Sequence, residues 1–389
     1  MDTVRTSLAE LTSTAAEDWH LVFKARYGMQ QVFAALNAAS EVRGVVTQSL
    51  TCATAVDPIM VAGQRPVYGD ISEQSLALDP DRLPAPASWG AVVIQHTFGI
   101  VDAARSARLA AAARANSALV VEDSAHALGR MVRSADGTPL ADVSIHSFGA
   151  EKSLPTKFGG AIWVNPEMAD TAVREDITRR LESMRPPGSR LALAARTYRL
   201  QMAVLRRLPG GVGRATRRAL TSAKLFEPPV APSEQEGRLA HSDVGASPWV
   251  VGHMSEHLPG LAALEATRIA AVGVYAKVLS DLMPWSADVV GQPLIRMPLL
   301  TPDAVDTAAV VDALRDRGIY VGTWYRPALF PGVADPEAYC YDPNDPNLSV
   351  TRDVIERIVN LPTSVTEAEA ERIARDTLDV LEVLRNAST

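Results

Sequence analysis

Short apolar runs alternate with segments of helical spacing through the first 165 residues of the chain. Four of these runs have the length of strands: residues 91–94, 119–121, 144–148 and 160–164. Residues 102–115, between the first two runs, form an alanine-rich amphipathic pattern typical of a helix. Continuous apolar strands separated by helices indicate a mostly parallel, buried sheet with helices on both faces. The pattern therefore predicts an α/β fold.

The end of the chain has a different rhythm. Leucine, valine and other apolar residues recur at helical spacing over residues 258–282, which predicts one long bridging helix. Beyond it we expect strands at 293–300 and 320–321 and helices at 303–316 and 367–385. These elements predict a large domain over residues 1–255, followed by the bridging helix and a smaller C-terminal α+β domain over 256–389.

Residues 166–250 interrupt the alternation and are rich in arginine, proline and glycine. We interpret this stretch as helices with a long excursion, serving either as a lid or interface element or as a solvated surface insertion. Thirteen of the 38 lysines and arginines fall between Arg174 and Lys224. The Arg-rich insertion, about 179–250, could attract a nucleotide diphosphate or touch an anionic membrane surface. Alternatively, its arginines pair with acids of the large domain or of a partner subunit.

Composition narrows the class of protein. A chain of 389 residues with 47% hydrophobic residues can bury more than one core. The net charge of −7 gives no overall case for nucleic-acid binding. Cys52 and Cys340, the two cysteines, allow neither a disulfide framework nor a zinc site, and we predict no metal. Without an apolar signal core or a membrane-length apolar run, we expect a soluble cytoplasmic protein.

One acid and one lysine stand at chemically suggestive positions. Asp123 lies where an apolar run stops, and Lys152 follows just past the next run. In such sheets, ligands bind beyond the carboxyl ends of the strands. Pyridoxal phosphate chemistry needs a lysine amine for a Schiff base and a carboxylate that holds the pyridine nitrogen protonated. Either residue alone would be an ordinary turn acid or a solvated surface charge, so the surrounding motifs decide.

Those motifs follow one another in a recognisable order. They are Tyr27-Gly28-Met29-Gln30, Thr51-Cys52-Ala53-Thr54, Gly63 to Asp70, Gln95-His96-Thr97-Phe98-Gly99, Glu122-Asp123-Ser124-Ala125-His126-Ala127-Leu128-Gly129, Ser147-Phe148 to Lys152, Gly159-Gly160-Ala161, Tyr325-Arg326-Pro327 and Asn360-Leu361-Pro362. Together they resemble the DegT/StrS family of pyridoxal-phosphate sugar aminotransferases, which have the fold-type-I architecture. The resemblance covers most of the chain apart from the Arg-rich insertion, and the Asp123-to-Lys152 block is its most specific part.

The resemblance implies roles for particular residues and pyridoxal 5'-phosphate as the cofactor. Lys152 would form the Schiff base and Asp123 would pair with the pyridine nitrogen. Ser147 would donate its hydroxyl to the cofactor phosphate. The backbone amides after Gly28, through Met29 and Gln30, would bind the same phosphate at a helix N-terminus. Thr51 and Cys52 would line the cofactor site.

The chain departs from the family pattern at several of these positions. Met29 replaces the phosphate-site threonine, and Cys52 replaces an aromatic residue that could pack on the cofactor ring. His126 replaces a glutamine beside the phenolic oxygen of the cofactor. It either takes over that hydrogen bond or is an ordinary polar residue at a strand end. The Asn-Tyr-Arg motif, which reaches the partner subunit's cofactor, is missing, and residues 251–256 occupy its place.

The resemblance favours an aminotransferase that moves an amino group from an amino acid, glutamate or glutamine, to a keto group. The family's usual acceptor is a nucleotide-linked keto-sugar, and its usual assembly is a homodimer. Two alternatives remain. One is a pyridoxal-phosphate lyase, aldolase or dehydratase on the same fold, because fold does not fix the reaction. The other is a degenerate, non-catalytic family member.

Overall fold

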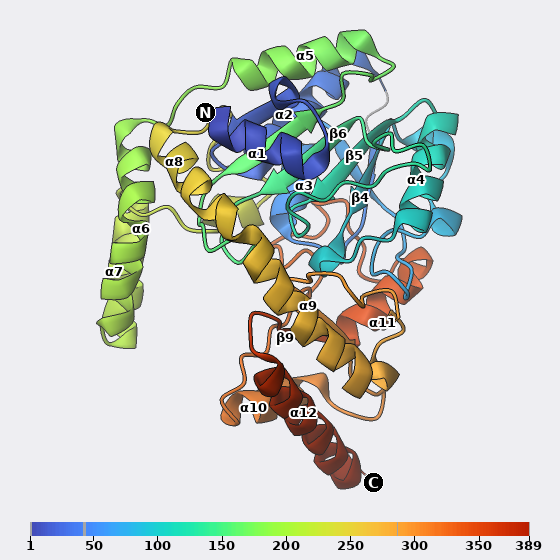
Figure 1. The fold of residues 1–389 in the computed structure, drawn as a ribbon, viewed down its shortest axis with the longest axis vertical. Coiled ribbons are helices and arrows are strands. Elements are labelled where there is room, and N and C mark those ends of the chain that lie inside the picture. Colours follow the sequence, from blue (N-terminus) through green and yellow to red (C-terminus); the bar gives the residue numbers. More distant parts are fainter. Residues whose placement is uncertain (1, 42–43, 286, 389) are drawn as a thin grey trace.

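The computed structural model describes residues 2–41, 44–285 and 287–388. At its centre lies a seven-stranded sheet of order β1-β7-β6-β5-β4-β2-β3 (Figure 1). Its strands are β1 (Trp19–Val22), β2 (Gly44–Thr47), β3 (Arg65–Tyr68), β4 (Ala91–Gln95), β5 (Leu119–Ser124), β6 (Val143–Ser147) and β7 (Gly160–Val164). The five adjacent strands β3, β2, β4, β5 and β6 pair in parallel. Strand β7 is antiparallel to its two neighbours, β1 and β6. The four predicted strands and the mostly parallel sheet are therefore confirmed.

Helices cover both faces of this sheet, which explains the continuous apolar runs. In β4, Ala91 and Val93 join a buried cluster with α2 (Ala25–Ala39) and α5 (Thr171–Glu182). Val92 and Ile94 point the other way and pack with α4 (Ala103–Ala115), the helix predicted at 102–115. Because successive side chains of a strand alternate between faces, a strand buried on both must be apolar throughout. A further helix, α3 (Ala53–Val61), follows β2.

A helix that the sequence pattern did not predict begins the described chain. In α1 (Asp2–Thr12), Val4 and Leu8 are fully buried and belong to the same cluster as Trp19 and Met254. Met254 lies on α8 (Pro248–His257). Two apolar residues one turn apart make a stripe that is too short to stand out in the sequence, and tertiary packing supplies the rest of the stability.

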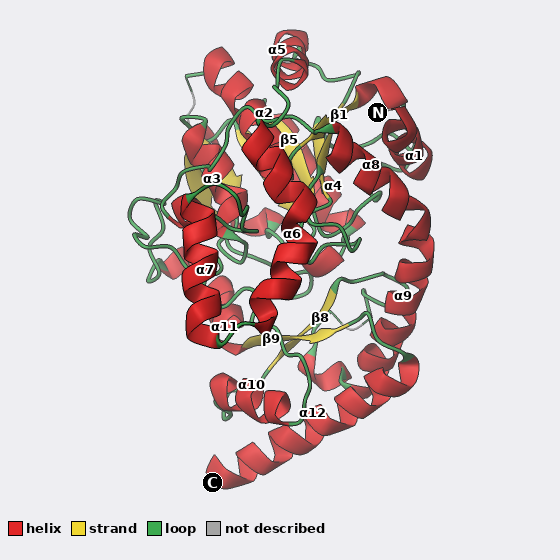
Figure 2. Cartoon of the chain, turned by 90° about the vertical axis from the view of Figure 1, so that its left-hand side faces the viewer, coloured by secondary structure: helices red, strands yellow, loops and turns green. Residues whose placement is uncertain are grey.

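The arginine-rich stretch consists of helices, as interpreted from the sequence. After α5 come α6 (Ser189–Arg207) and α7 (Gly210–Ser222), which lie side by side at the flank of the large domain (Figure 2). We call these two helices and their connection the α6–α7 hairpin. None of the helices in the described ranges has the length and apolar character required to cross a membrane.

The smaller C-terminal part begins with the predicted bridging helix, seen as α9 (Leu261–Val278) (Figure 1). A two-stranded antiparallel sheet pairs β8 (Arg296–Leu300) with β9 (Ile358–Pro362), and α10 (Thr307–Asp316), α11 (Ser349–Arg357) and α12 (Glu367–Ser388) surround it. The strand expected at 320–321 is wrong: only Gly322 forms a bridge, to Asn360. The bridge consists of two backbone hydrogen bonds, and a Cβ at Gly322 would lie 2.1 Å from the Asn360 side chain, so only glycine fits at this position. The domain boundary at 255/256 stays a prediction.

The packing of β7 on α2 makes a stability prediction. A Cβ added at Gly160 would lie 2.5 Å from backbone atoms of Ala25, which cannot move away as a side chain would. We expect Gly160→Ala to lower the free energy of unfolding by about 1–3 kcal/mol through overpacking. Gly252, on α8, has open space around its Cβ position, so Gly252→Ala should be neutral or stabilising by about 0.5–1 kcal/mol. Urea denaturation of both variants checks this. Equal stabilities would contradict it.

Candidate active site

Three parallel strands deliver polar side chains to one edge of the sheet. Gln95 ends β4, Asp123 lies near the end of β5 and Ser147 ends β6, and the register places Gln95 directly beside Asp123. All three line a cavity with a volume of about 280 Å³. The cavity therefore lies beyond the carboxyl ends of the strands, where ligands bind in sheets of this kind.

Lys152 and Asp123 both line this cavity. The charge of each side chain shifts the pKa of the other. Burial lowers the pKa of Lys152 below its usual range, although Cys52 and Asp123 act in the opposite direction. Burial also raises the pKa of Asp123, opposed by a hydrogen bond from the Ala125 amide (3.0 Å) and by the charge of Lys152. Both shifts have the same physical origin, because removal from water disfavours the charged form of either group.

His126 lies in a stack of aromatic rings contributed by the C-terminal part of the chain. Its ring is nearly parallel to those of Trp324 and Tyr325, with centroids 5.6 and 6.2 Å away. The Phe98 amide donates to His126 Nδ1 (3.1 Å), so the proton sits on Nε2, which lies 3.2 Å from the Tyr325 hydroxyl. Burial, with the nearby charge of Lys152, lowers the pKa of His126 well below its usual value. The imidazole is therefore neutral, with both nitrogens engaged by the protein.

The predicted phosphate-binding turn differs from expectation in detail. Helix α2 begins at Ala25, before Gly28, so the backbone amides free at its N-terminus belong to Ala25 and Arg26. Both residues line the cavity, whereas Gly28 does not. A Cβ at Gly28 would lie 2.5 Å from Ile162, so glycine is required there for close packing of α2 on β7. This corrects the expectation that the helix opens at Gly28.

The remaining predicted residues divide into two groups. Met29, Thr51 and Cys52 line the cavity. Thr51 Oγ1 donates to the Gln95 side chain, and Cys52 Sγ lies 3.0 Å from Thr54 Oγ1. Gln30 does not line the cavity and accepts a hydrogen bond from Gln31 Nε2 (2.6 Å). The roles assigned to these residues by the resemblance stay predictions.

A buried polar network behind the cavity was not predicted. His96, which lines the cavity, donates from Nε2 to Glu122 (2.9 Å). Glu122 also accepts from the Val132 amide and from the Ser144 hydroxyl, at 2.7 and 2.8 Å. Burial would raise the pKa of Glu122, but these donors outweigh it and keep the pKa below its usual value. The ionised carboxylate thus fixes the orientation of His96.

Two ion pairs that join distant parts of the sequence close one side of the cavity. Lys24 pairs with Glu227, and Arg26 pairs with Glu234 at 2.6 Å. Each of the two glutamates is almost completely buried. The segment between them, which follows the α6–α7 hairpin, contributes Pro229 and Val230 to the cavity wall. The hairpin is therefore connected to the cavity through a return segment, residues 227–234, that the ion pairs hold in place.

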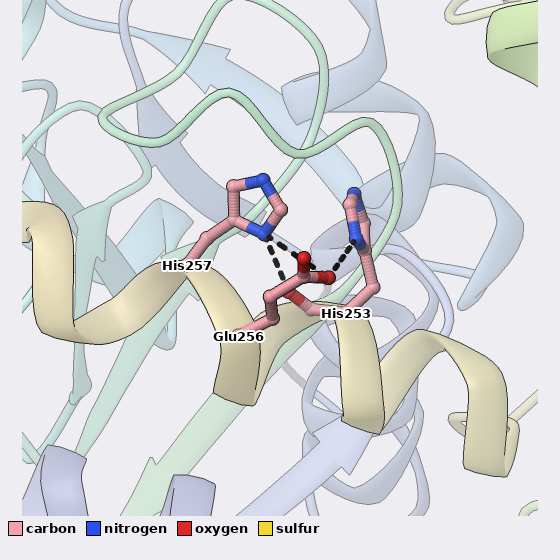
Figure 3. Close-up of side chains that lie close together, drawn as sticks. All are labelled: His253, Glu256 and His257. Atoms are coloured by element: carbon pink, nitrogen blue, oxygen red, sulfur yellow. Dashed lines mark hydrogen bonds and ion pairs between the residues drawn. The ribbon is translucent and has the colours of Figure 1, made fainter.

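A second cluster of titratable groups lies outside the cavity, at the end of α8. His253, Glu256 and His257 gather on one side of the helix (Figure 3). The Nε2 atoms of both histidines lie 3.3–3.4 Å from the same Arg199 nitrogen, on α6. A guanidinium cation thus sits where a metal ion shared by those two nitrogens would bind. We interpret the cluster as a polar contact between α6 and α8 and not as a metal site.

Part of the chain is similar in sequence to a known protein family. Residues 27–205 match the sequence model of the DegT/DnrJ/EryC1/StrS aminotransferase family. This segment, which is less than half of the chain, is thus similar to that family. The resemblance drawn from the motifs is confirmed. The match to the family ends two residues before the end of α6, so α7 lies beyond its limit.

Individual family relatives cover only part of the chain. The Spore coat polysaccharide biosynthesis protein SpsC of Bacillus subtilis is 33% identical over 132 residues, 33% of each chain. The UDP-2-acetamido-2-deoxy-3-oxo-D-glucuronate aminotransferase of Pseudomonas aeruginosa is 29% identical over 164 residues, 41% of this chain and 45% of that protein. The matched segments thus span between a third and a half of the length of these curated relatives.

Solved structures extend the likeness to nearly the whole chain. Helicobacter pylori PseC, an aminotransferase involved in the biosynthesis of pseudoaminic acid, superposes with a TM-score of 0.70 at 16% identity. The superposition covers 98% of this chain and 90% of that one. At this identity the likeness establishes the fold alone. The predicted fold-type-I architecture is confirmed.

The ion pairs of the return segment make a testable prediction. Burial would raise the pKa of Glu227, but Lys24 and His241 lower it to about 2. Glu227→Gln leaves the buried Lys24 without its counter-charge, and we expect a loss of about 3–5 kcal/mol of unfolding free energy at pH 7. Because the folded-state pKa is depressed, the difference between native chain and variant should shrink as pH falls from about 4.5 towards 2.

Urea denaturation across this pH range measures the difference. Glu236→Gln is the matched control, since Glu236 forms an exposed pair with Arg238. Such a surface pair contributes about 0–1 kcal/mol. A Glu227→Gln variant no less stable than the control would contradict the prediction.

Proposed function

We propose that this chain is a pyridoxal 5'-phosphate-dependent aminotransferase that moves an amino group from glutamate or glutamine to a keto group on a nucleotide-linked sugar. One observation carries the proposal: Lys152 and Asp123 face one buried cavity at the carboxyl edge of β5 and β6. The family match supports the reaction class. The printed name of the Pseudomonas relative, a UDP-linked 3-oxo-sugar aminotransferase, supports the acceptor class.

The residues present fit the cofactor. Lys152 offers the amine and Asp123 the carboxylate; Asp123 is buried and Lys152 is partly buried. Ser147 and the free amides of Ala25 and Arg26 offer donors for a phosphate at the N-terminus of α2. Bound there, the cofactor would supply an electron sink and a carrier for the amino group.

The side chains of the cavity have distinct chemical tasks in this proposal. Burial lowers the pKa of Lys152, which favours a neutral amine that could act as a nucleophile and hold or release a proton on Nζ. A cation placed against Asp123 would lower the pKa that burial raises, so the carboxylate would be ionised when the site is filled. Pro229, Val230 and Phe330 contribute apolar side chains to the cavity wall.

We further propose a homodimer in the cytoplasm. The family resemblance supports this assembly, as do Ile269 and Val278, which are exposed at 36% each on the bridging helix α9. The region of the missing Asn-Tyr-Arg motif is α8, so a partner subunit would meet a helix there. We infer that phosphate binding relies on the chain's own Ser147 and α2.

A spectroscopic assay tests the function. The purified protein, incubated with pyridoxal 5'-phosphate and dialysed, should be yellow, and glutamate or glutamine should bleach it within one turnover. Asp123→Asn should slow the bleaching by about 100-fold or more, because a neutral ring nitrogen makes a poorer electron sink. A yellow protein bleached by neither donor would favour a lyase, and a colourless protein would favour a non-catalytic family member.

The lysine assignment has an internal control. Lys152→Ala should lose the yellow colour and all turnover, because no amine remains to bind the cofactor covalently. Lys157 also lines the cavity and is half-buried, so Lys157→Ala is the matched control and should stay yellow. Absorbance spectra and single-turnover rates of both variants decide. If only Lys157→Ala loses the colour, the assignment of Lys152 is wrong.

A further inference from the structure

The α6–α7 hairpin and its flanking residues carry charge of one sign. Residues 183–226, which include the hairpin, contain nine arginines and Lys224 but no aspartate or glutamate. The chain as a whole carries a net charge of −7. Acids that could neutralise these arginines locally are therefore absent from the segment itself. A surface with such an excess of one sign attracts anionic partners and raises their local concentration.

The hairpin stands away from the core and leaves aliphatic side chains in solvent. No residue of α7 is buried, and α6 packs against the body through Ala194, Ala195 and Tyr198. On α6, Leu193, Leu200 and Val204 are exposed at 49%, 68% and 50%. Single exposed apolar residues need no explanation, but three on one helix do.

Helical geometry places these three side chains on one stripe. Leu200 and Val204 follow Leu193 by seven and eleven residues, about two and three turns of a helix. The stripe lies away from the packed face, because Ala195 and Tyr198 are about half a turn and Ala194 about a quarter of a turn from it. Arg196 and Arg207 are exposed beside the stripe. We call the face formed by Leu193, Arg196, Leu200, Val204 and Arg207 the outer face of α6.

Contacts from both helices hold the hairpin in position. On α6, Arg199 donates to the Pro155 carbonyl (2.7 Å) and lies against His253 and His257 of α8. On α7, the Arg217 guanidinium lies 5.5 Å from the centre of the Phe226 ring, next to the ion-paired Glu227. The hairpin is thus fastened along its inner side, and its outer face is presented to solvent.

We propose that the outer face of α6 docks the protein on an anionic lipid bilayer. Aliphatic side chains flanked by arginines are the composition of helices that lie in the membrane interface, with long cationic side chains reaching up to the headgroups. A nucleic acid fits less well, because single strands are bound by exposed aromatic rings. The two aromatic residues of segment 183–226, Tyr198 and Phe226, are both buried.

Sedimentation with vesicles tests the docking on the full chain. Vesicles of phosphatidylcholine, with or without phosphatidylglycerol, are mixed with the protein at low and at high salt. We expect at least about tenfold tighter binding to the vesicles with phosphatidylglycerol, and a marked loss of binding at high salt. Absence of binding to anionic vesicles at low salt would overturn the proposal.

Paired variants separate the two parts of the outer face. Arg196→Gln with Arg207→Gln, and separately Leu200→Ser with Val204→Ser, should each weaken vesicle binding by about fivefold or more. Two pairs on other elements are the matched controls: Arg65→Gln with Arg375→Gln, and Leu378→Ser with Val383→Ser, all at exposed positions. These controls should bind as the native chain does. Full binding after loss of Leu200 and Val204 would overturn the insertion of this face.

Two further measurements identify a different occupant. Duplex DNA that binds more tightly than anionic vesicles, with the same loss in the Arg196→Gln, Arg207→Gln variant, would overturn the lipid proposal. Sedimentation velocity tests whether a second copy of the chain occupies the outer face. If Leu200→Ser with Val204→Ser converts a dimer to a monomer, the face is a subunit contact and the lipid proposal is overturned. None of these readouts uses substrate, so they are independent of the proposed reaction.

Discussion

The electrostatic interaction of Lys152 with Asp123 in one cavity is the interaction around which the candidate site is built. Parallel pairing of β4, β5 and β6 brings their carboxyl ends to one edge, so an acid and an amine that are distant in sequence share one cavity. Burial raises the pKa of Asp123 and lowers the pKa of Lys152, which favours the neutral form of each side chain. Such groups are costly to bury without compensation, and their pairing in a cleft is typical of a reactive site.

The cavity is completed by segments far away in the sequence, each fixed by its own polar contacts. Glu122, on β5, orients His96, and its carboxylate accepts hydrogen bonds from Ser144 of β6 and from the Val132 amide. Trp324 and Tyr325 arrive from the C-terminal part and stack on His126. A site assembled from both parts of the chain depends on their relative placement, which large buried clusters maintain.

The return segment, residues 227–234, connects the arginine-rich hairpin to this cavity. Its two glutamates pair with Lys24 and Arg26 at the start of α2. The free backbone amides of the helix N-terminus lie at the same place. Buried ion pairs contribute little net stability, but removal of one partner is strongly destabilising. The hairpin therefore cannot shift far without disturbing the wall of the cavity, while its outer surface stays available for contact.

The sequence by itself determined the α/β class, the parallel sheet, the bridging helix, the resemblance to the family and the positions of Asp123 and Lys152 after strands, because periodicity and short motifs are local properties. It did not determine α1, whose two buried residues make too short a pattern, or the pairing of β8 with β9 in place of 320–321. Only the tertiary structure decided that Gly28 packs against Ile162, that His126 uses both ring nitrogens within the protein, and that Glu227 and Glu234 close the cavity. These features join residues up to about 200 positions apart, and non-local contacts leave no local pattern to read.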